Sequence, residues 1–333
     1  MGNLKVLGIE SSCDDTAIAV VEDGRTLVSQ AAASSAKIHA RYGGIVPEVA
    51  AREHTMAILP VLEETLERAQ IPLAALDAIA VTEGPGLLGA LLIGVTFAKA
   101  LGVGLGIPVV GVHHLEAHLY ANALIAPITF PALGLLVSGG HTTLVLWEGH
   151  GQLKVLGETR DDAAGEAFDK GARVLGLPYP GGPQIERLAR TVEVKSGLRL
   201  PLANLGSKSL DFSFSGLKTA TREMASTHPT RRAEIALALE DAVVRALVKI
   251  TERALTQYPV ADLYLAGGVT ANGALRQAMA DLAARRQVRL HLPPMGLCTD
   301  NAAMVAALGY YRLGQGHRMK NDDSARTTYS LGD

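Results

Sequence analysis

The sequence predicts an α/β protein built from two duplicated lobes with a cleft between them. Its 333 residues exceed the usual size of a single domain. An order of strand, polar turn, strand, turn and strand opens the chain at residues 5–33 and is repeated at residues 133–158. Helical and strand periods alternate after each of these meanders. Such a repeat indicates two related lobes that face each other, with nucleotide phosphates between their polar turns.

Composition excludes few partners but indicates a compartment. The 31 basic and 33 acidic residues nearly balance, so the net charge does not decide for or against a nucleic-acid partner. Cys13 and Cys298 are the only cysteines, and their wide separation argues for a reducing compartment and against a disulfide framework. The N-terminus lacks a secretory pattern, and no run of about 18 apolar residues is present. We therefore expect a cytoplasmic protein.

The opening meander surrounds a turn rich in hydroxyls and carboxylates, residues 11–16. Its backbone N–H groups could cradle a phosphate, while Asp14 and Asp15 could hold a cation or accept a proton. An ordinary polar hairpin loop is the alternative. The elements expected in the rest of the first lobe are a helix over 49–69 interrupted by Pro60, a strand over 76–82, a glycine-rich turn at 84–89, a small-residue apolar helix to Gly102, and a strand over 109–112.

Three histidines follow the last of these strands, where the pattern changes from strand to helix. On a helix, His114 and His118 lie four residues apart and share a face, so they could offer two imidazole nitrogens to one divalent cation. His113 would point elsewhere. Ordinary histidines at a helix start are the alternative, although three in six residues weaken it.

A zinc protease is a competing interpretation of these histidines. In that motif a glutamate directly follows the first ligand and acts as general base. Here Glu116 stands two places after His114, about 160° around the helix axis. It could not easily reach a water held on the metal, so the spacing argues against a protease.

The second lobe is expected to alternate in the same way. Its predicted elements are strands over 133–137, 143–147 and 153–158, a capped helix at 161–170, a glycine-rich bend at 180–183, an irregular region over 191–232, a helix over 233–257, a strand over 261–265, a helix over 273–285, a strand over 288–292, and a last helix over 302–313 capped by residues 298–301.

Two features of this lobe could contact a nucleotide or a polyanion. Glycines after the strand 261–265 would let a flat ring slide against the backbone, and Asn272 could hydrogen-bond a ribose or base edge. The irregular region carries scattered basic residues, for which a solvated surface loop is the simpler interpretation. They are Lys208, Lys218, Arg222, Arg231 and Arg232.

Over its whole length the chain resembles the bacterial TsaD family of the Kae/Qri group, formerly called O-sialoglycoprotein endopeptidases. That group belongs to the actin-like, sugar-kinase and Hsp70-like ATPase superfamily, whose lobes are RNase H-like. The motifs that carry the resemblance are residues 8–16 (GIESSCDDT), 113–118 (HHLEAH), 136–142 (LVSGGHT), 161–170 (DDAAGEAFDK), 179–183 (YPGGP), 211–218 (DFSFSGLK), 266–272 (AGGVTAN) and 298–301 (CTDN).

The resemblance implies an acyltransferase that moves a threonylcarbamoyl group from threonylcarbamoyl-AMP to N6 of adenosine 37, in tRNAs that read codons beginning with A. It implies one Fe²⁺ per subunit at His114, His118 and Asp300, with Zn²⁺ as a substitute in vitro. It implies tRNA, TsaB and TsaE as partners, with the adenylate supplied by a separate TsaC-type synthase. The residues it implies for binding the adenylate are Leu136, Val137, Ser138, Gly139, Gly140, Asp169, Gly182 and Asn272.

The chain departs from the family pattern at two positions. Asp15 stands where many bacterial relatives have glutamate, and Leu136 where archaeal relatives place a metal-binding tyrosine. Asp14 or Asp15 could accept the proton lost by the attacking amine. Cys298 is the rival of Asp300 as third ligand, since a thiolate would favour zinc, whereas two histidines and a carboxylate suit ferrous iron.

The expected division is an N-terminal lobe over 1–130, with 300–325 packing back onto it, and a C-terminal lobe over 131–299. Two other classes of function are compatible with such lobes. An ATPase or sugar kinase would need Mg²⁺ and would turn over ATP, and the histidine helix is unusual for that role. A non-catalytic scaffold would need no metal-binding triad.

Overall fold

The computed structural model describes residues 3–40, 42, 44–193 and 197–332. Their contacts divide the chain into two compact units. Unit 1 comprises residues 1–128 and 299–333, and unit 2 comprises residues 129–298. The end of the chain thus folds with its beginning.

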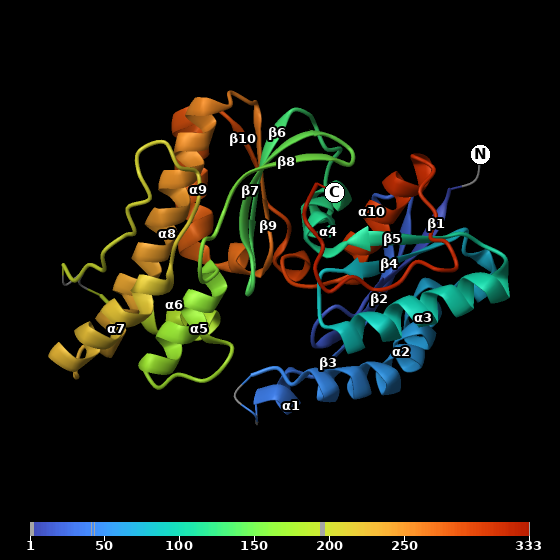
Figure 1. Cartoon of the computed structure of the whole chain (residues 1–333), viewed down its shortest axis with the longest axis horizontal. Coiled ribbons are helices and arrows are strands. Elements are labelled where there is room, and N and C mark those ends of the chain that lie inside the picture. The colour runs from blue at the N-terminus through green and yellow to red at the C-terminus, as the bar shows by residue number, and fades with distance from the viewer. Residues whose placement is uncertain (1–2, 41, 43, 194–196, 333) are drawn as a thin grey trace. The chain divides into compact units, whose positions relative to one another are not determined.

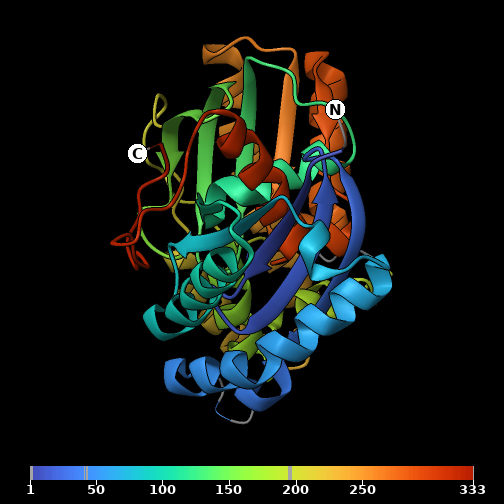
Figure 2. The same cartoon turned by 90° about the vertical axis from the view of Figure 1, so that its right-hand side faces the viewer.

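Unit 1 is a five-stranded sheet with helices on both faces (Figure 1). Its strand order is β3-β2-β1-β4-β5, antiparallel from β1 to β3 and parallel from β1 to β5. Figure 2 shows the blue helix α2 running across the first strands. The elements are β1 (Lys5–Glu10), β2 (Asp15–Glu22), β3 (Thr26–Ser34), α1 (Ala36–Ala40), α2 (Pro47–Ala69), β4 (Ala78–Gly84), α3 (Leu88–Leu105), β5 (Val109–His113), α4 (His114–Tyr120) and α10 (Ala302–Gly314).

Strand β1 is buried on both faces and fixes the position of α10. Leu7 and Ile9 point into the core that α2 and α3 help to form. Gly8 faces the opposite way, where an added Cβ would lie 2.1 Å from the Ala302 carbonyl oxygen. Because a glycine stands there, α10 packs directly on β1.

One expectation for the helices of unit 1 was wrong. Helix α2 is not interrupted at Pro60 but runs unbroken across it. Pro60 lies on an exposed face, so the Met56 carbonyl that loses its N–H partner can be solvated. Helix α3 is long and apolar enough to cross a membrane by length and composition, with a mean hydropathy of 1.9. It packs against α2 and β4, and a single such helix is weak evidence for a span.

Unit 2 repeats the strand arrangement of unit 1. Its order, β8-β7-β6-β9-β10, has the same antiparallel and parallel halves, which confirms the duplication predicted from the sequence. The elements are β6 (Ala132–Val137), β7 (Thr142–Gly149), β8 (Gln152–Glu158), α5 (Ala164–Val174), α6 (Gly181–Ala189), α7 (Ser215–Thr227), α8 (Arg232–Gln257), β9 (Asp262–Ala266), α9 (Gly273–Arg286) and β10 (Arg289–His291).

A remote carboxylate accounts for two differences from the expected elements of unit 2. Asp161 does not begin α5, which starts at Ala164 without a side-chain cap. Its Oδ1 instead accepts hydrogen bonds from the N–H groups of Phe214 and Ser215, at 2.8 and 3.1 Å, at the start of α7. Part of the region 191–232 is therefore helical, while residues 194–196 lie outside the described residues.

A buried carboxylate joins β9 to the edge strand β10 of unit 2. Asp262 on β9 accepts two hydrogen bonds from the guanidinium of Arg289 on β10, at 2.8 and 2.6 Å, and lies 2.7 Å from His291 Nε2. Burial raises the pKa of Asp262, but these hydrogen bonds outweigh it and lower the pKa to about 2.

We predict that Asp262→Asn destabilises unit 2 at neutral pH and flattens its acid dependence. The folded pKa lies below the unfolded value of 3.8, so the stabilisation is present above pH 4 and is lost as the pH falls towards 2. The shift corresponds to up to about 2 kcal/mol of unfolding free energy. Urea unfolding at several pH values measures it. Asp241→Asn, which removes an exposed pair with Arg245, is the control; equal acid dependence of Asp262→Asn and the wild type would contradict the prediction.

Candidate functional site

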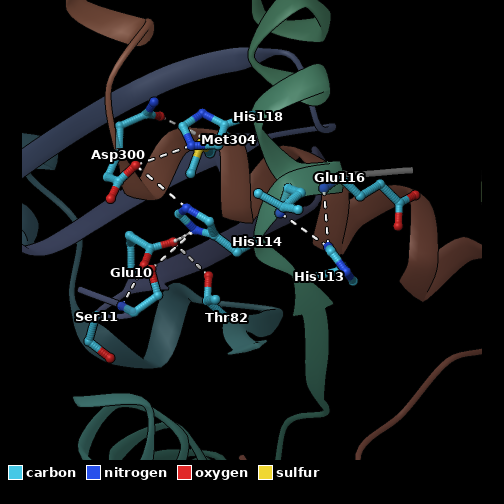
Figure 3. Close-up of polar contacts among 12 residues, drawn as sticks. Glu10, Ser11, Thr82, His113, His114, Glu116, His118, Asp300 and Met304 are labelled. Carbon is cyan, nitrogen blue, oxygen red and sulfur yellow. Dashed lines mark hydrogen bonds and ion pairs between the residues drawn. The ribbon is translucent and has the colours of Figure 1, made fainter. Parts of the chain in front are cut away.

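The histidine helix begins with a histidine cap. His113 ends β5, and its Nδ1 accepts from the N–H groups of Leu115 and Glu116 at 3.1 and 3.4 Å (Figure 3). Since Nδ1 accepts, Nε2 carries the proton and donates to the Tyr329 carbonyl oxygen at 3.0 Å. His113 therefore has a structural role and points away from His114, as the sequence predicted.

His114 and His118 share one face of α4, and Asp300 lies beside them. Ligand atoms from these three residues all lie within 4.8 Å of one another. Asp300 Oδ1 is 3.1 Å from His118 Nε2 and 3.6 Å from His114 Nε2. Asn301, the next residue, caps α10 by accepting from Met304 N–H. Because the cap fixes the backbone at Asn301, it also restrains the position of the neighbouring Asp300.

This donor set fits a divalent transition metal. Two imidazole nitrogens and one carboxylate oxygen are ligands of Zn²⁺ and non-haem Fe²⁺, and three protein ligands leave positions open for a substrate. Both histidines are buried, while Asp300 retains some exposure. The group can therefore hold a metal and still admit a ligand.

The electrostatics of the group also favour a cation. Burial lowers the pKa of His114, but the Glu10 and Asp300 carboxylates outweigh it and raise the pKa to about 9. In the same way burial raises the pKa of Glu10, and the charge and hydrogen bond of His114 bring it below its usual value. The surroundings thus stabilise positive charge where a metal would bind.

Glu10 is the residue of this group that sequence reasoning missed. Its Oε1 accepts from Ser12 N–H at 2.7 Å, and its Oε2 accepts from Thr82 Oγ1 at 2.7 Å and lies 3.1 Å from His114 Nδ1. The available signal was an acidic residue closing an apolar strand, Lys5–Glu10.

The rival third ligand, Cys298, is engaged elsewhere. Its buried Sγ lies 3.6 and 3.4 Å from the carbonyl oxygens of Pro293 and Pro294 and 3.3 Å from the Arg276 guanidinium. Glu116, the base required by a protease, is paired with Arg312 of α10 at 2.5 Å. The geometry supports neither a thiolate ligand nor a protease.

Asp15, one of the two candidate bases, has a partly buried carboxylate. Burial raises the pKa of Asp15, which brings a carboxyl group closer to the range useful for accepting a proton. Within the described part of the chain its Oδ1 is buried with no hydrogen-bond partner. The backbone carbonyl of Asp14 accepts hydrogen bonds from Ser35, just after β3, and these bonds do not involve the Asp14 carboxylate.

The expected adenylate residues all lie in unit 2. Leu136 and Val137 are fully buried at the end of β6. Ser138 closes a turn with His141, since each backbone N–H is bonded to an oxygen of the other residue. An added Cβ at Gly139 or Gly140 would meet nothing within 4 Å. Their backbone is therefore open to a ligand.

Asp169 and Gly182 form a second cluster. Asp169 Oδ1 accepts from Gly181 N–H at 2.6 Å, which orders the start of α6 next to Gly182. Burial raises the pKa of Asp169, although its contacts to the Gly181 and Gly182 backbone act in the opposite direction. Asp169 can thus shape this loop without itself touching a ligand.

Asn272 has a structural role that the sequence analysis did not anticipate. Its Oδ1 caps α9 by accepting from Leu275 N–H at 2.9 Å, and its Nδ2 donates to Glu240 at 2.7 Å. Any contact of this side chain with a ribose or base must share these bonds.

Comparison with known proteins agrees with the fold. A family model described as "TsaD: tRNA N6-adenosine threonylcarbamoyltransferase" matches residues 26–307. A tRNA N6-adenosine threonylcarbamoyltransferase of Geobacillus thermodenitrificans is 52% identical over 94% of this chain and 93% of its own length. A protein of the same description from Bacillus thuringiensis is 51% identical over 95% of this chain and 93% of its own length.

Among solved structures, the ROK hexokinase of Thermus thermophilus has a TM-score of 0.54 at 16% identity, over 94% of this chain and 100% of its own. Full-length HypF has a TM-score of 0.63 at 10% identity, over 94% of this chain and 46% of its own. These likenesses show the two-lobed fold of actin-like ATPases and sugar kinases. Within that class, the chain belongs to the TsaD family of tRNA N6-adenosine threonylcarbamoyltransferases.

We predict that His113→Ala destabilises unit 1 by about 1–2 kcal/mol, because it removes the cap of α4 and the bond to Tyr329. His113→Asn should recover part of the loss, since asparagine is a good cap. Equilibrium urea unfolding measures both variants. An unchanged free energy of unfolding in His113→Ala would show that the cap does not stabilise the helix.

Proposed function

We propose that the protein transfers the threonylcarbamoyl group from threonylcarbamoyl-AMP to N6 of adenosine 37, in tRNAs that read codons beginning with A. Its membership of the TsaD family supports this reaction. The grouping of His114, His118 and Asp300 is the structural observation that carries the proposal.

The reaction forms one bond and breaks another. The N6 amine attacks the carbamoyl carbon, a C–N bond forms, and the bond from that carbon to the phosphate oxygen breaks to release AMP. The amine loses one proton, which we assign to the carboxylate of Asp15, with Asp14 as the alternative acceptor. The buried Oδ1 of Asp15 supports the choice of Asp15 over Asp14 as the proton acceptor.

We assign the metal to His114, His118 and Asp300, and we propose Fe²⁺, with Zn²⁺ able to replace it in vitro. When bound, the ion supplies Lewis acidity and a template for phosphate or carbamoyl oxygens. His114 and His118 supply neutral nitrogen ligands from one helix face, and Asp300 supplies the charge that holds a divalent ion.

We assign the adenylate to residues of unit 2. The open backbone of Gly139 and Gly140 would bind it directly, and Asp169 would hold the loop of Gly182 in place. Leu136, Val137 and Ser138 would act by fixing the turn that presents those glycines. Asn272 would contribute mainly by fixing α9.

The protein would work in the cytoplasm with TsaB and TsaE, on an adenylate made by a TsaC-type synthase. Apolar side chains exposed on neighbouring helices support a docking surface for TsaB. Leu88 of α3 is 52% exposed and Met56 of α2 is 66% exposed. Such side chains on packed helices are typical of an interface.

Depletion of the protein from cells should remove threonylcarbamoyl-adenosine from tRNA, measured by mass spectrometry of nucleosides. Plasmid-borne wild type should restore it. Unchanged modification after depletion would contradict the proposed reaction.

We predict that Asp300→Ala loses bound metal and transfer activity while keeping a cooperative thermal unfolding transition. Removing the carboxylate leaves two imidazoles, which bind a divalent ion weakly. Cys298→Ser should keep both properties. Metal analysis and single-turnover transfer to tRNA measure the pair. A metal-free Cys298→Ser protein with metal-replete Asp300→Ala would overturn the ligand assignment.

We predict that Leu88→Glu abolishes complex formation with TsaB and lowers multiple-turnover activity without lowering the thermal stability of the isolated protein. A buried charge at an apolar interface is costly, whereas the same charge in the free protein is solvated. Val103→Glu, on an 81% exposed position 15 residues further along the same helix, is the matched control because it lies outside the proposed docking surface of Leu88 and Met56. Size-exclusion chromatography measures the complex. Normal assembly of Leu88→Glu would place the interface elsewhere.

A further inference from the structure

We infer that Glu10 is a positioning residue that fixes the ring and the tautomer of His114, so that Nε2 of His114 is available to the metal. The inference rests on the proposed metal-binding function. It adds a carboxylate–histidine–metal relay to the group of His114, His118 and Asp300.

The contacts of Glu10 are those of an orienting acceptor. Its carboxylate is buried and receives Ser12 N–H on one oxygen and Thr82 Oγ1 on the other, each at 2.7 Å. These two bonds hold the carboxylate plane from the turn between β1 and β2 and from β4. The oxygen shared with Thr82 lies 3.1 Å from His114 Nδ1 (Figure 3). Because a carboxylate only accepts, this contact requires a proton on Nδ1, and the Ser12 hydroxyl, whose Oγ lies 3.2 Å from the same nitrogen, is then a second acceptor.

The proton on Nδ1 determines what the other nitrogen can do. A neutral His114 with N–H at Nδ1 has its lone pair at Nε2, the atom that faces Asp300 at 3.6 Å. The second histidine differs: in the described part of the chain, His118 Nδ1 is buried without a hydrogen-bond partner. Glu10 therefore orients the first ligand specifically.

A purely structural role does not explain a carboxylate in this place. A buried charge is costly unless it is compensated, and the hydroxyl of Thr82 and the N–H of Ser12 could be satisfied by a neutral amide oxygen. Among the partners of Glu10 in the described residues, His114 is the one that can carry a positive charge. The carboxylate is therefore matched to a cationic or metal-bound imidazole.

The variant Glu10→Gln tests this point because it keeps the volume while it removes the negative charge and changes the hydrogen-bond pattern. The amide oxygen must stay on Ser12 N–H, so the amide NH₂ would face Thr82 and His114 Nδ1. An NH₂ donor there removes the charged acceptor of the Nδ1 proton and favours the tautomer with the proton on Nε2, which has no lone pair to offer the metal. The alternative amide orientation places two donors against each other at Ser12.

The experiment is a competition titration of Zn²⁺ against a chromophoric chelator. We expect Glu10→Gln to bind Zn²⁺ about 10- to 100-fold more weakly than the wild type. Glu116→Gln is the matched control, because it also removes a buried carboxylate from this region but one that is paired with Arg312. Its Zn²⁺ affinity should stay within twofold of the wild type.

The outcomes separate this inference from the proposed function. Wild-type affinity in Glu10→Gln, with Asp300→Ala deficient, would overturn the role of Glu10 and leave the metal site intact. Equal weakening in Glu10→Gln and Glu116→Gln would also overturn it, because general destabilisation would explain the loss. Equal Zn²⁺ affinity of the wild type and Asp300→Ala would overturn the metal site and this inference together.

A second measurement does not depend on the folding of any variant. In the Zn²⁺-loaded wild type labelled with ¹⁵N-histidine, the ring nitrogens report their state by chemical shift. We expect a protonated Nδ1 and a metal-bound Nε2 for His114, assigned by the loss of its signals in His114→Gln. A metal-bound Nδ1 would overturn the inference.

Discussion

The close packing of α10 on strand β1 is the constraint on which the candidate site depends. It is possible because Gly8 has no side chain where the Ala302 carbonyl approaches the strand. The helix begins at a cap on Asn301, so Asp300 is held at the edge of the sheet where α4 starts. A second tie, the pair of Arg312 and Glu116, joins α10 to α4. Two segments separated by more than half the chain are thereby brought to one place.

This arrangement buries several ionisable groups that the fold must compensate. Glu116 is matched by Arg312, and Glu10 is matched by His114. The first pair is structural, since no metal ligand takes part in it. The second pair includes a candidate metal ligand, so its cost of burial is coupled to metal binding. A buried ion pair thus has a structural use on one face of α4 and a use coupled to metal binding on the other.

Local patterns predicted much of the fold and part of the site. The spacing of His114 and His118 followed from helix geometry, and the repeated meander predicted the duplicated sheets. Sequence reasoning failed where a residue acts on a distant segment. Asp161 starts a helix more than 50 residues away, and Asn272 bonds Glu240 of another helix. Glu10 was missed for the same reason, because its partner His114 is remote in the chain. No local period encodes such contacts.

The most direct test of the account is X-ray absorption at the iron edge of the protein loaded anaerobically with Fe²⁺. We expect a first shell of nitrogen and oxygen only, with two imidazole ligands recognised by their outer-shell scattering. Asp300→Ala should lose the bound iron, while Cys298→Ser should give the wild-type spectrum. A sulfur atom in the first shell, or a shell without imidazole, would contradict the assignment of the metal to His114, His118 and Asp300.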